Sequence, residues 1–225
     1  MSDYRLPRFI LTLIAALSCG RPNVADAGEY KLPELRLQDP MPLTETLRLR
    51  RSVRDYAPTD LTLEAAAQLL WAAQGITSPD GRRTAPSAGA LYPLELHLVA
   101  GKVEGLPDGS YRYDPERHSL TLTAPGDLRS ALAHAALDQS WIAQAPAVVV
   151  IAAVPKRTTR KYGERGIRYV HIEVGHAGQN LLLQAVGLGL RSVVVGAFRD
   201  RAVQQLLGLA SDEHPLAILP VGHPR

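Results

Sequence analysis

Residues 82–95 read Arg-Arg-Thr-Ala-Pro-Ser-Ala-Gly-Ala-Leu-Tyr-Pro-Leu-Glu, so the chain changes here from basic to small side chains. The centre of this segment, Pro86, Ser87, Ala88 and Gly89, is nearly free of side chains, which lets a flat ligand approach the backbone closely. Ser87 adds a hydroxyl group, and Gly89 permits backbone angles that other residues resist. An ordinary turn before a strand is the alternative interpretation.

The hydrophobic pattern around this segment mixes helices and strands. Alternation over residues 93–99 predicts a half-buried strand, and the unbroken apolar run 147–154 predicts a central strand covered on both faces. Further strands are expected at 109–113, 119–123, 191–198 and 216–221, and helices at 44–51, 62–74, 128–137, 169–186 and 200–207, the last capped by Asp200. Several strands lack simple crossover connections, which favours an α+β sheet layered with helices.

The N-terminus has the pattern of an export signal. Arg5 and Arg8 precede an apolar run at residues 9–17, and Ala25-Asp-Ala27 offers a cleavage site before Gly28. A lipoprotein signal ending at Cys19, or a buried first helix of a cytoplasmic protein, are the alternatives. We expect a signal peptide at residues 1–27, a polar arm at 28–42 and one domain at 43–225.

The net charge is only +3, which implies no general attraction to nucleic acid. A basic segment, residues 155–168, is expected to be a loop, but no aromatic interleaving supports nucleic-acid binding by it. The only cysteine is Cys19, so removal of the signal excludes thiol chemistry and disulfides.

Arginines are concentrated at residues 50–54, which read Arg-Arg-Ser-Val-Arg. One guanidinium group can donate two parallel hydrogen bonds to the oxygens of a phosphate. A phosphate can therefore be held by Arg50, Arg51, Ser52 and Arg54. The alternative is a solvated, charged helix end. The chain contains neither the Gly-x-Gly-x-x-Gly motif of dinucleotide folds nor a phosphate-binding Gly-x-x-x-x-Gly-Lys loop.

The expected helix at 169–186 carries Glu173 and His176 in a Glu-x-x-His pattern. Di-iron bundles need that pattern twice, and the chain has it once. His171 and His176 lie about 140° apart on a helix and cannot share a metal. We therefore expect no metal site. Gly175 and Gly178, on nearly one face, suggest close contact with another helix or a ligand.

Three motifs together resemble the nitroreductase superfamily: residues 50–54, residues 86–93, and Lys161-Tyr-Gly-Glu-Arg-Gly-Ile-Arg-Tyr169 followed by Glu173, Gly175, His176, Gln179 and Asn180. Within it, the chain resembles the SagB/ThcOx-type FMN-dependent dehydrogenases of azoline-containing peptides. The resemblance extends from about Leu43 to Arg225. It implies a nitroreductase-like α+β fold, with a mostly antiparallel central sheet flanked by helices, and a homodimer with FMN at the subunit interface.

The resemblance also implies roles for single residues. The FMN phosphate and ribityl chain would contact Arg50, Arg51, Ser52 and Arg54, with Arg225 reaching the phosphate from the C-terminus. The isoalloxazine ring would be lined by Pro86, Ser87, Ala88 and Gly89 of the second subunit, and by backbone groups of Val195 and Gly196.

In the azoline branch a Lys-Tyr pair abstracts a proton, and Lys161-Tyr162 matches it. Neighbouring cations disfavour the charged form of a lysine, which makes it a better base. The alternative is that Lys161 is one more solvated cation. We expect an FMN-dependent oxidoreductase that transfers hydride between flavin N5 and an organic substrate. An azoline-to-azole peptide dehydrogenase with partner proteins, a non-catalytic FMN-binding protein and a nucleic-acid-binding module are the alternatives. The substrate, the electron donor or acceptor and the direction of reaction stay open.

Overall fold

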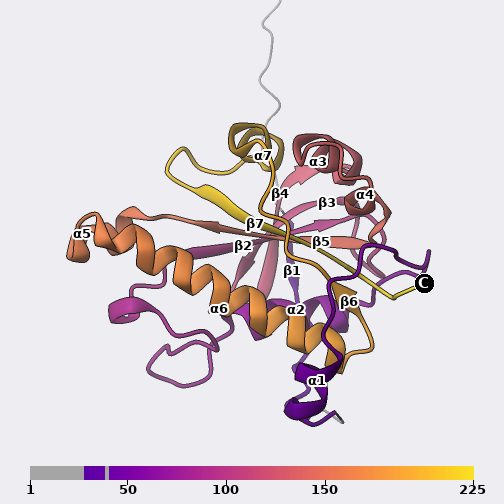
Figure 1. Ribbon diagram of the computed structural model, residues 1–225, viewed down its shortest axis with the longest axis horizontal. Coiled ribbons are helices and arrows are strands. Elements are labelled where there is room, and N and C mark those ends of the chain that lie inside the picture. Colours follow the sequence, from indigo (N-terminus) through magenta and orange to yellow (C-terminus); the bar gives the residue numbers. More distant parts are fainter. Residues whose placement is uncertain (1–27, 39–40) are drawn as a thin grey trace, which may run out of the picture.

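The computed structural model describes residues 28–38 and 41–225, and its centre is a seven-stranded sheet. The strand order is β1-β4-β3-β2-β5-β7-β6, and neighbouring strands pair antiparallel (Figure 1). The strands are β1 (Glu29–Lys31), β2 (Leu94–Ala100), β3 (Gly109–Asp114), β4 (Ser119–Pro125), β5 (Ala147–Ala153), β6 (Arg191–Ser192) and β7 (His214–Gly222). The predicted α+β class with an antiparallel sheet is confirmed.

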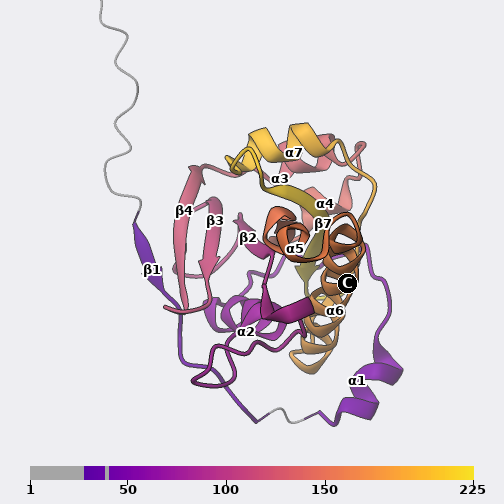
Figure 2. The ribbon, with the colours of Figure 1, turned by 90° about the vertical axis from the view of Figure 1, so that its left-hand side faces the viewer.

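Helices cover both faces of the sheet. The helices are α1 (Leu43–Leu49), α2 (Leu63–Gln74), α3 (Arg129–Ala135), α4 (Trp141–Gln144), α5 (Lys156–Tyr162), α6 (Arg165–Gly187) and α7 (Asp200–Leu207). Figures 1 and 2 show α2 and α6 on one face, and α3, α4 and α7 on the other. Two apolar cores result, because each face of the sheet buries its own set of Leu, Val, Ile and Ala side chains.

Local signals explain where the helices begin and end. The Thr62 hydroxyl accepts the N–H of Ala65 at 3.2 Å, and Gly75 follows the last residue of α2. Gly208 ends α7 with a φ of 67°, which glycine adopts without steric cost. The prediction that Asp200 caps α7 is wrong by one position. Arg199 precedes the helix and Asp200 is its first residue, where a negative charge still favours the helix dipole.

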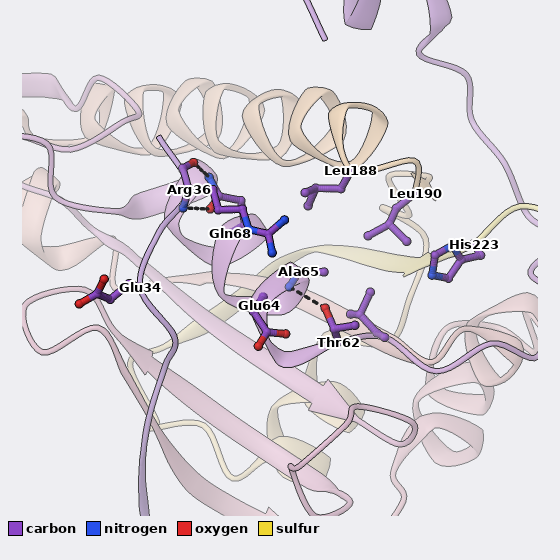
Figure 3. Close-up of a pocket in the computed structure, with 10 residues that line it drawn as sticks. Glu34, Arg36, Thr62, Glu64, Ala65, Gln68, Leu188, Leu190 and His223 are labelled. Carbon is purple, nitrogen blue, oxygen red and sulfur yellow. Dashed lines mark hydrogen bonds between the residues drawn. The ribbon is translucent and has the colours of Figure 1, made fainter. Parts of the chain in front are cut away.

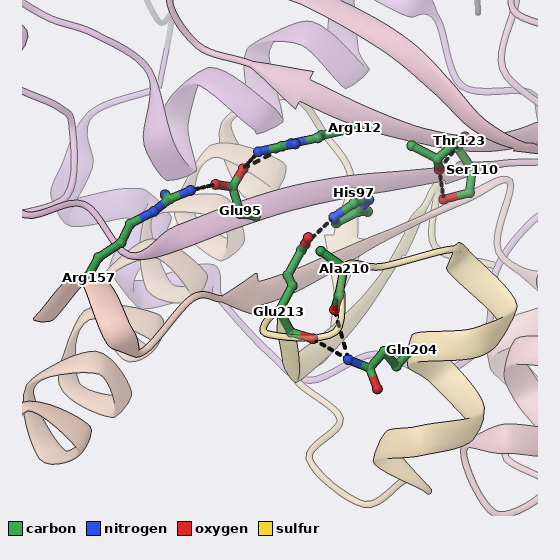
Figure 4. A network of polar contacts seen from close by, with 9 residues as sticks. All are labelled: Glu95, His97, Ser110, Arg112, Thr123, Arg157, Gln204, Ala210 and Glu213. Atoms are coloured by element: carbon green, nitrogen blue, oxygen red, sulfur yellow. Dashed lines mark hydrogen bonds and ion pairs between the residues drawn. The ribbon is translucent and has the colours of Figure 1, made fainter. Parts of the chain in front are cut away.

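Strand β2 is buried on both faces, although its alternating pattern predicted one exposed face. Leu94, Leu96 and Leu98 pack into the core under α2 and α6. On the opposite face His97 Nε2 lies 2.5 Å from Glu213 Oε1, and both side chains are buried (Figure 4). Polar residues are therefore inside here because a distant segment supplies their partners.

The polar arm joins the sheet and α2. Its strand β1 pairs with β4. The backbone N–H of Arg36 donates to the side-chain oxygen of Gln68, and the Gln68 side-chain nitrogen donates to the Arg36 carbonyl, both at 3.1 Å (Figure 3). A cavity of about 320 Å³ lies between the arm, α2 and the chain beyond α6. No predicted site residue lines this cavity.

Two sequence-based expectations fall outside the described residues: the export signal at 1–27 and the lipidation alternative at Cys19. Within residues 28–38 and 41–225, no helix is long and apolar enough to span a bilayer.

Core packing in the central sheet gives a stability test. Leu98 on β2 is fully buried, so Leu98→Ala should lower the free energy of unfolding by about 2–5 kcal/mol. Urea denaturation of the folded protein measures this change. Leu37→Ala serves as the matched control, because Leu37 is 78% exposed and its truncation leaves no cavity. Equal midpoints for the two variants would contradict this description of the core.

Candidate functional site

Sheet register brings two distant segments together at one end of the molecule. Leu94 at the start of β2 pairs with Ala153 at the end of β5, and Val154 N donates to Pro93 O at 2.8 Å. Because these strands are antiparallel, the chain entering β2 and the chain leaving β5 lie side by side. The first is the 86–92 segment and the second is α5.

The 86–92 segment holds a strained backbone. Gly89 has a φ of 64°, and Ala90 and Tyr92 also have positive φ values, of 54° and 43°. Such angles cost a non-glycine residue about 1–3 kcal/mol each and persist only where surrounding contacts impose them. Here the Ser87 hydroxyl accepts the N–H of Tyr92 at 2.9 Å, and Arg157 donates to the Tyr92 carbonyl at 3.0 Å.

Lys161 and Tyr162 lie directly against Gly89. A methyl group at Gly89 would come within 2.8 Å of the Tyr162 hydroxyl oxygen and 3.0 Å of Lys161 Nζ. Glycine is favoured at this position by its positive φ and by the close approach of the two side-chain ends. The Lys161 ammonium also lies 5.4 Å from the centre of the Tyr162 ring, and Tyr169 packs edge-on against that ring at 5.1 Å. Two motifs predicted separately thus meet in one place.

The predicted loop at 155–168 is wrong, because most of this segment is helical. Pro155 precedes α5 and Gly163 ends it with a φ of 59°, which are ordinary start and stop signals for a helix. A methyl group at Gly166 would lie 2.9 Å from Thr159 Cα, so glycine allows the closely spaced turn into α6. The density of positive charge concealed these signals. Lys161 and Tyr162 consequently lie in the last turn of a helix.

Glu173 on α6 is buried beside this segment. It borders a cavity of about 280 Å³ that is also lined by Pro86, Ser87, Ala88, Tyr169, Ile172 and His176. Glu173 is 2% exposed, and its Oε1 has no hydrogen-bond partner within the described part of the chain. Burial raises the pKa of Glu173 to about 7, opposed by a hydrogen bond from Ser87 and by the charge of Arg83. The sequence analysis considered Glu173 only in a Glu-x-x-His pattern and as part of a family motif; its helical spacing could not reveal this burial.

The predicted phosphate-binding residues lie elsewhere. Arg51, Ser52 and Arg54 are exposed just after α1, with Arg50 half-buried before them. Val53 N donates to the Ser192 carbonyl at 3.2 Å, which holds this segment beside β6. Arg225 reaches the same region, with its Nε 3.6 Å from Asp55 Oδ1. The Ser192 hydroxyl is buried and has no partner among the described residues.

Val195 and Gly196 follow β6 at the edge of the sheet. Val195 exchanges backbone hydrogen bonds of 2.8 and 2.9 Å with Ile218, whereas Gly196 is exposed and faces open space. The predicted strand 191–198 is wrong beyond Ser192. The chain leaves the sheet with Val194 exposed and returns only at Val195, so β6 contains two residues.

Helix α6 separates the two groups of predicted residues within one chain. The 86–89 segment lies beside Glu173, and Ser192 follows the C-terminal end of the helix at Gly187. At a rise of 1.5 Å per residue, Glu173 and Gly187 are about 21 Å apart along the helix axis. Figure 1 shows α5 and β6 at opposite ends of α6.

The two expected glycine contacts also differ: Gly178 faces Ile151 and Leu219 in the core, whereas Gly175 faces open space.

Comparison with protein families assigns the fold. The model of the nitroreductase family matches residues 47–223. The chain belongs to the nitroreductase family. It is therefore an oxidoreductase. Members of this family typically depend on a flavin, which is generally FMN.

Several relatives support this assignment. A Methanocaldococcus jannaschii protein described as a nitroreductase is 46% identical over 199 residues, which cover 88% of this chain and 98% of the relative. The crystal structure of a Ralstonia eutropha protein described in the same way has a TM-score of 0.78 and 30% identity, over 91% of this chain and 94% of that one.

Two of the similar proteins are microcin-processing proteins of Escherichia coli. The microcin B17-processing protein McbC is 28% identical over 182 residues, covering 77% of this nitroreductase and 65% of McbC, slightly less than two thirds of the relative. A chain of the microcin synthetase McbBCD complex, with truncated pro-microcin B17 bound, has a TM-score of 0.68 and 21% identity, over 97% of this chain and 85% of that one. At that identity the structural likeness concerns the fold alone.

The buried Glu173 predicts a pH-dependent stability. Its pKa rises from an ordinary 4.5 to about 7 on folding, so between these values the folded chain retains a proton that the unfolded chain releases. The contribution of Glu173 to stability therefore decreases as the pH rises through this window. Glu173→Gln, which is always neutral, should gain melting temperature relative to the parent between pH 5 and 8. Differential scanning calorimetry at several pH values measures the difference.

Glu104→Gln is the control for this comparison, because Glu104 is exposed. Its melting temperature should follow that of the parent at every pH. A Glu173→Gln variant that also parallels the parent across the window would contradict the buried, protonated state.

Proposed function

We propose that this nitroreductase is an FMN-dependent dehydrogenase of the SagB/ThcOx type, acting on an organic substrate. The observation that carries the proposal is the close approach of Lys161 Nζ and Tyr162 Oη to Gly89. A potential base and a hydroxyl group lie there against a backbone that has almost no side chains. Such a surface suits a flat ring, and the base suits a reaction that releases a proton.

The phosphate end of FMN fits the residues around β6. Arg51, Ser52 and Arg54 are exposed, and the C-terminal Arg225 lies beside Asp55 of the same segment. The Arg51 guanidinium donates to the carbonyls of Arg48 and Arg50, and that of Arg54 lies 5.7 Å from the centre of the Trp141 ring. Turned towards a phosphate, these arginines and Arg225 would form charge-assisted hydrogen bonds with its oxygens, and Arg50 adds a further cation. The unpartnered Ser192 hydroxyl supplies a donor that the protein itself leaves unused. The nearby Val195 and Gly196 offer backbone groups to the ring, since Gly196 is unobstructed.

The ring end of FMN fits the 86–89 segment. Pro86, Ser87 and Ala88 border a cavity of about 280 Å³, and Gly89 exposes bare backbone beneath Lys161. The hydrogen bonds from Tyr92 N to Ser87 and from Arg157 to the Tyr92 carbonyl hold this surface in one conformation, despite the strained angles at Ala90 and Tyr92. A preformed surface reduces the entropy that binding a flat ligand costs.

FMN held by these residues would supply the two-electron chemistry, as the acceptor of a hydride. Oxidation of a carbon–heteroatom or carbon–carbon bond also releases a proton from the adjacent atom, and the protein must receive it. We assign that proton to Lys161, with the Tyr162 ring, 5.4 Å from the Lys161 nitrogen, orienting its side chain. A positioned base contributes on the order of 100- to 10,000-fold in rate.

A second candidate function is narrower: dehydrogenation of azolines in peptides, with partner proteins. The similarity to McbC supports it, because McbC processes microcin B17 and the McbBCD structure contains a pro-microcin. Incubating the flavin-loaded protein with a thiazoline-containing peptide tests it. Loss of two hydrogen atoms, detected by mass spectrometry, is the expected result. An unchanged peptide mass, together with full reduction of the flavin by another substrate, would rule out azoline dehydrogenation by this chain in the absence of partner proteins.

The catalytic assignment can be separated from flavin binding by two variants. Arg51→Ala should lose the yellow flavin on gel filtration, because it removes a phosphate ligand. Lys161→Ala should retain the flavin and lose about 100- to 10,000-fold in the rate of substrate-driven flavin reduction, measured anaerobically by absorbance. Lys156→Ala, an exposed lysine on the same helix, is the control and should keep both properties. A Lys161→Ala rate equal to that of the parent would refute the role of the base.

We also propose that the active form is a homodimer. The two halves of the proposed site lie about 21 Å apart along α6, so two-fold symmetry can join each half to its complement on a second copy. Exposed apolar side chains support an interface on these elements: Leu43 and Leu47 on α1, and Ile167 and Ile172 on α6. Gly175 leaves room on the same outer side of α6 for a close neighbour.

Light scattering tests the dimer. The parent, expressed without residues 1–27, should have the mass of two chains. Ile172→Asp should produce a monomer with weakened flavin binding, because it places a charge in the apolar contact. Leu137→Asp changes an equally exposed leucine beyond α3, on the other face of the sheet, and should leave the dimer intact. A monomeric parent that still binds FMN would overturn the proposal.

A further inference from the structure

The buried carboxylate of Glu95 binds two arginines near the start of β2. Glu95 accepts hydrogen bonds from Arg112 Nε and Nη2 at 3.1 and 2.8 Å, and another from Arg157 Nη2 (Figure 4). The Glu95 side chain is only 10% exposed, whereas Arg112 and Arg157 are half-buried. Both carboxylate oxygens are therefore already engaged, and further N–H groups of the two arginines are left over.

A third arginine lies beside this pair without a counterion. The Arg83 guanidinium stacks on the Tyr92 ring at 4.6 Å, and its Nη1 donates to the Gln74 side chain at 2.8 Å. Within the described residues it forms no ion pair. Burial lowers the pKa of Arg83, and the negative charges of Glu95 and Glu173 oppose this shift.

These three arginines face an open cavity of about 560 Å³, which is large enough for a small organic molecule. The cavity is also lined by Glu95, Asp114 and Glu116. Asp114 Oδ1 accepts the backbone N–H groups of Glu116 and Arg117 at 2.8 and 3.2 Å, so it is engaged in the β3–β4 turn.

The charges of the lining balance, with three arginines against three carboxylates. Glu95 lies between Arg112 and Arg157 and bonds to both, Arg83 and Arg157 lie towards Tyr92, and Asp114 and Glu116 belong to the β3–β4 turn. A singly charged anion placed at the arginines gains charge-assisted hydrogen bonds.

The cavity adjoins the proposed catalytic groups. Arg157 and Lys161 are four residues apart on α5, and side chains at that spacing lie on the same face one turn apart. Tyr92 links the two places, since its ring contacts Arg83 and its N–H is bound by Ser87 of the 86–89 segment. A group held at the arginines would thus lie about one helical turn from Lys161.

We propose that this cavity is a subsite for a carboxylate group of the substrate, bound by Arg83, Arg112 and Arg157. The role as a substrate subsite rests on the proposed dehydrogenase function, whereas binding of the carboxylate itself does not. The substrate class is accordingly a small acid or a peptide with a free carboxylate, whose oxidised atoms lie near Lys161. A planar carboxylate matches the fork geometry of guanidinium groups.

Isothermal titration calorimetry of the flavin-loaded protein with N-acetylglycine tests the subsite. We expect saturable binding in the millimolar range or tighter, and none with N-acetylglycinamide, which lacks the charge. Arg83→Gln and, independently, Arg112→Gln should each raise the Kd about tenfold, as expected for loss of one charge-assisted contact. Two variants are needed because Arg83 also supports Tyr92, and the melting temperature of each verifies folding.

Arg82→Gln is the matched control, since Arg82 is the neighbouring, exposed arginine and does not line the cavity. It should leave the Kd unchanged. Absence of saturable binding, equal binding of the amide, binding of inorganic phosphate alone, or an equal loss in Arg82→Gln would each overturn the subsite. None of these measurements needs turnover, so their outcome is distinct from failure of the proposed dehydrogenase.

Discussion

The antiparallel pairing of β2 with β5 is the constraint on which the rest of the structure depends. Both strands are buried on both faces, so every backbone polar group in them must find a partner in a neighbouring strand, and those that face each other pair between β2 and β5. That requirement fixes the register at Leu94 and Ala153, and the register fixes where the chain enters β2 and leaves β5. The positions of Gly89 and Lys161 relative to each other are consequences of sheet hydrogen bonding.

Much of this framework could be predicted from the sequence because its signals are local. The continuous apolar run of β5 indicated a strand covered on both sides, and the caps of α2 were visible in Thr62 and Gly75. Strand β2 was more difficult. Glu95 and His97 look like solvent-facing residues, and only distant partners such as Arg157 and Glu213 make their burial tolerable. A local pattern cannot contain that information.

The candidate site divides in the same way. The small residues at 86–89 and the Lys161-Tyr162 pair were recognisable as motifs, whereas their contact depends on tertiary structure. Helix α5 was missed because its positive charges resemble a solvated loop, although Pro155 and Gly163 delimit a helix. The raised pKa of Glu173 depends on its burial in the folded chain, which no spacing along α6 could indicate.

The shared register of β2 and β5 also limits where the chain can gain or lose residues. One residue inserted into either strand would advance its end by about 3.3 Å and turn every later side chain to the opposite face. The chain between the two strands passes through the β3–β4 turn and the α3–α4 connection, where added residues extend outward without altering the pairing of Leu94 with Ala153. Length variation among functional homologues should therefore concentrate in those excursions, and grafted peptides belong there as well.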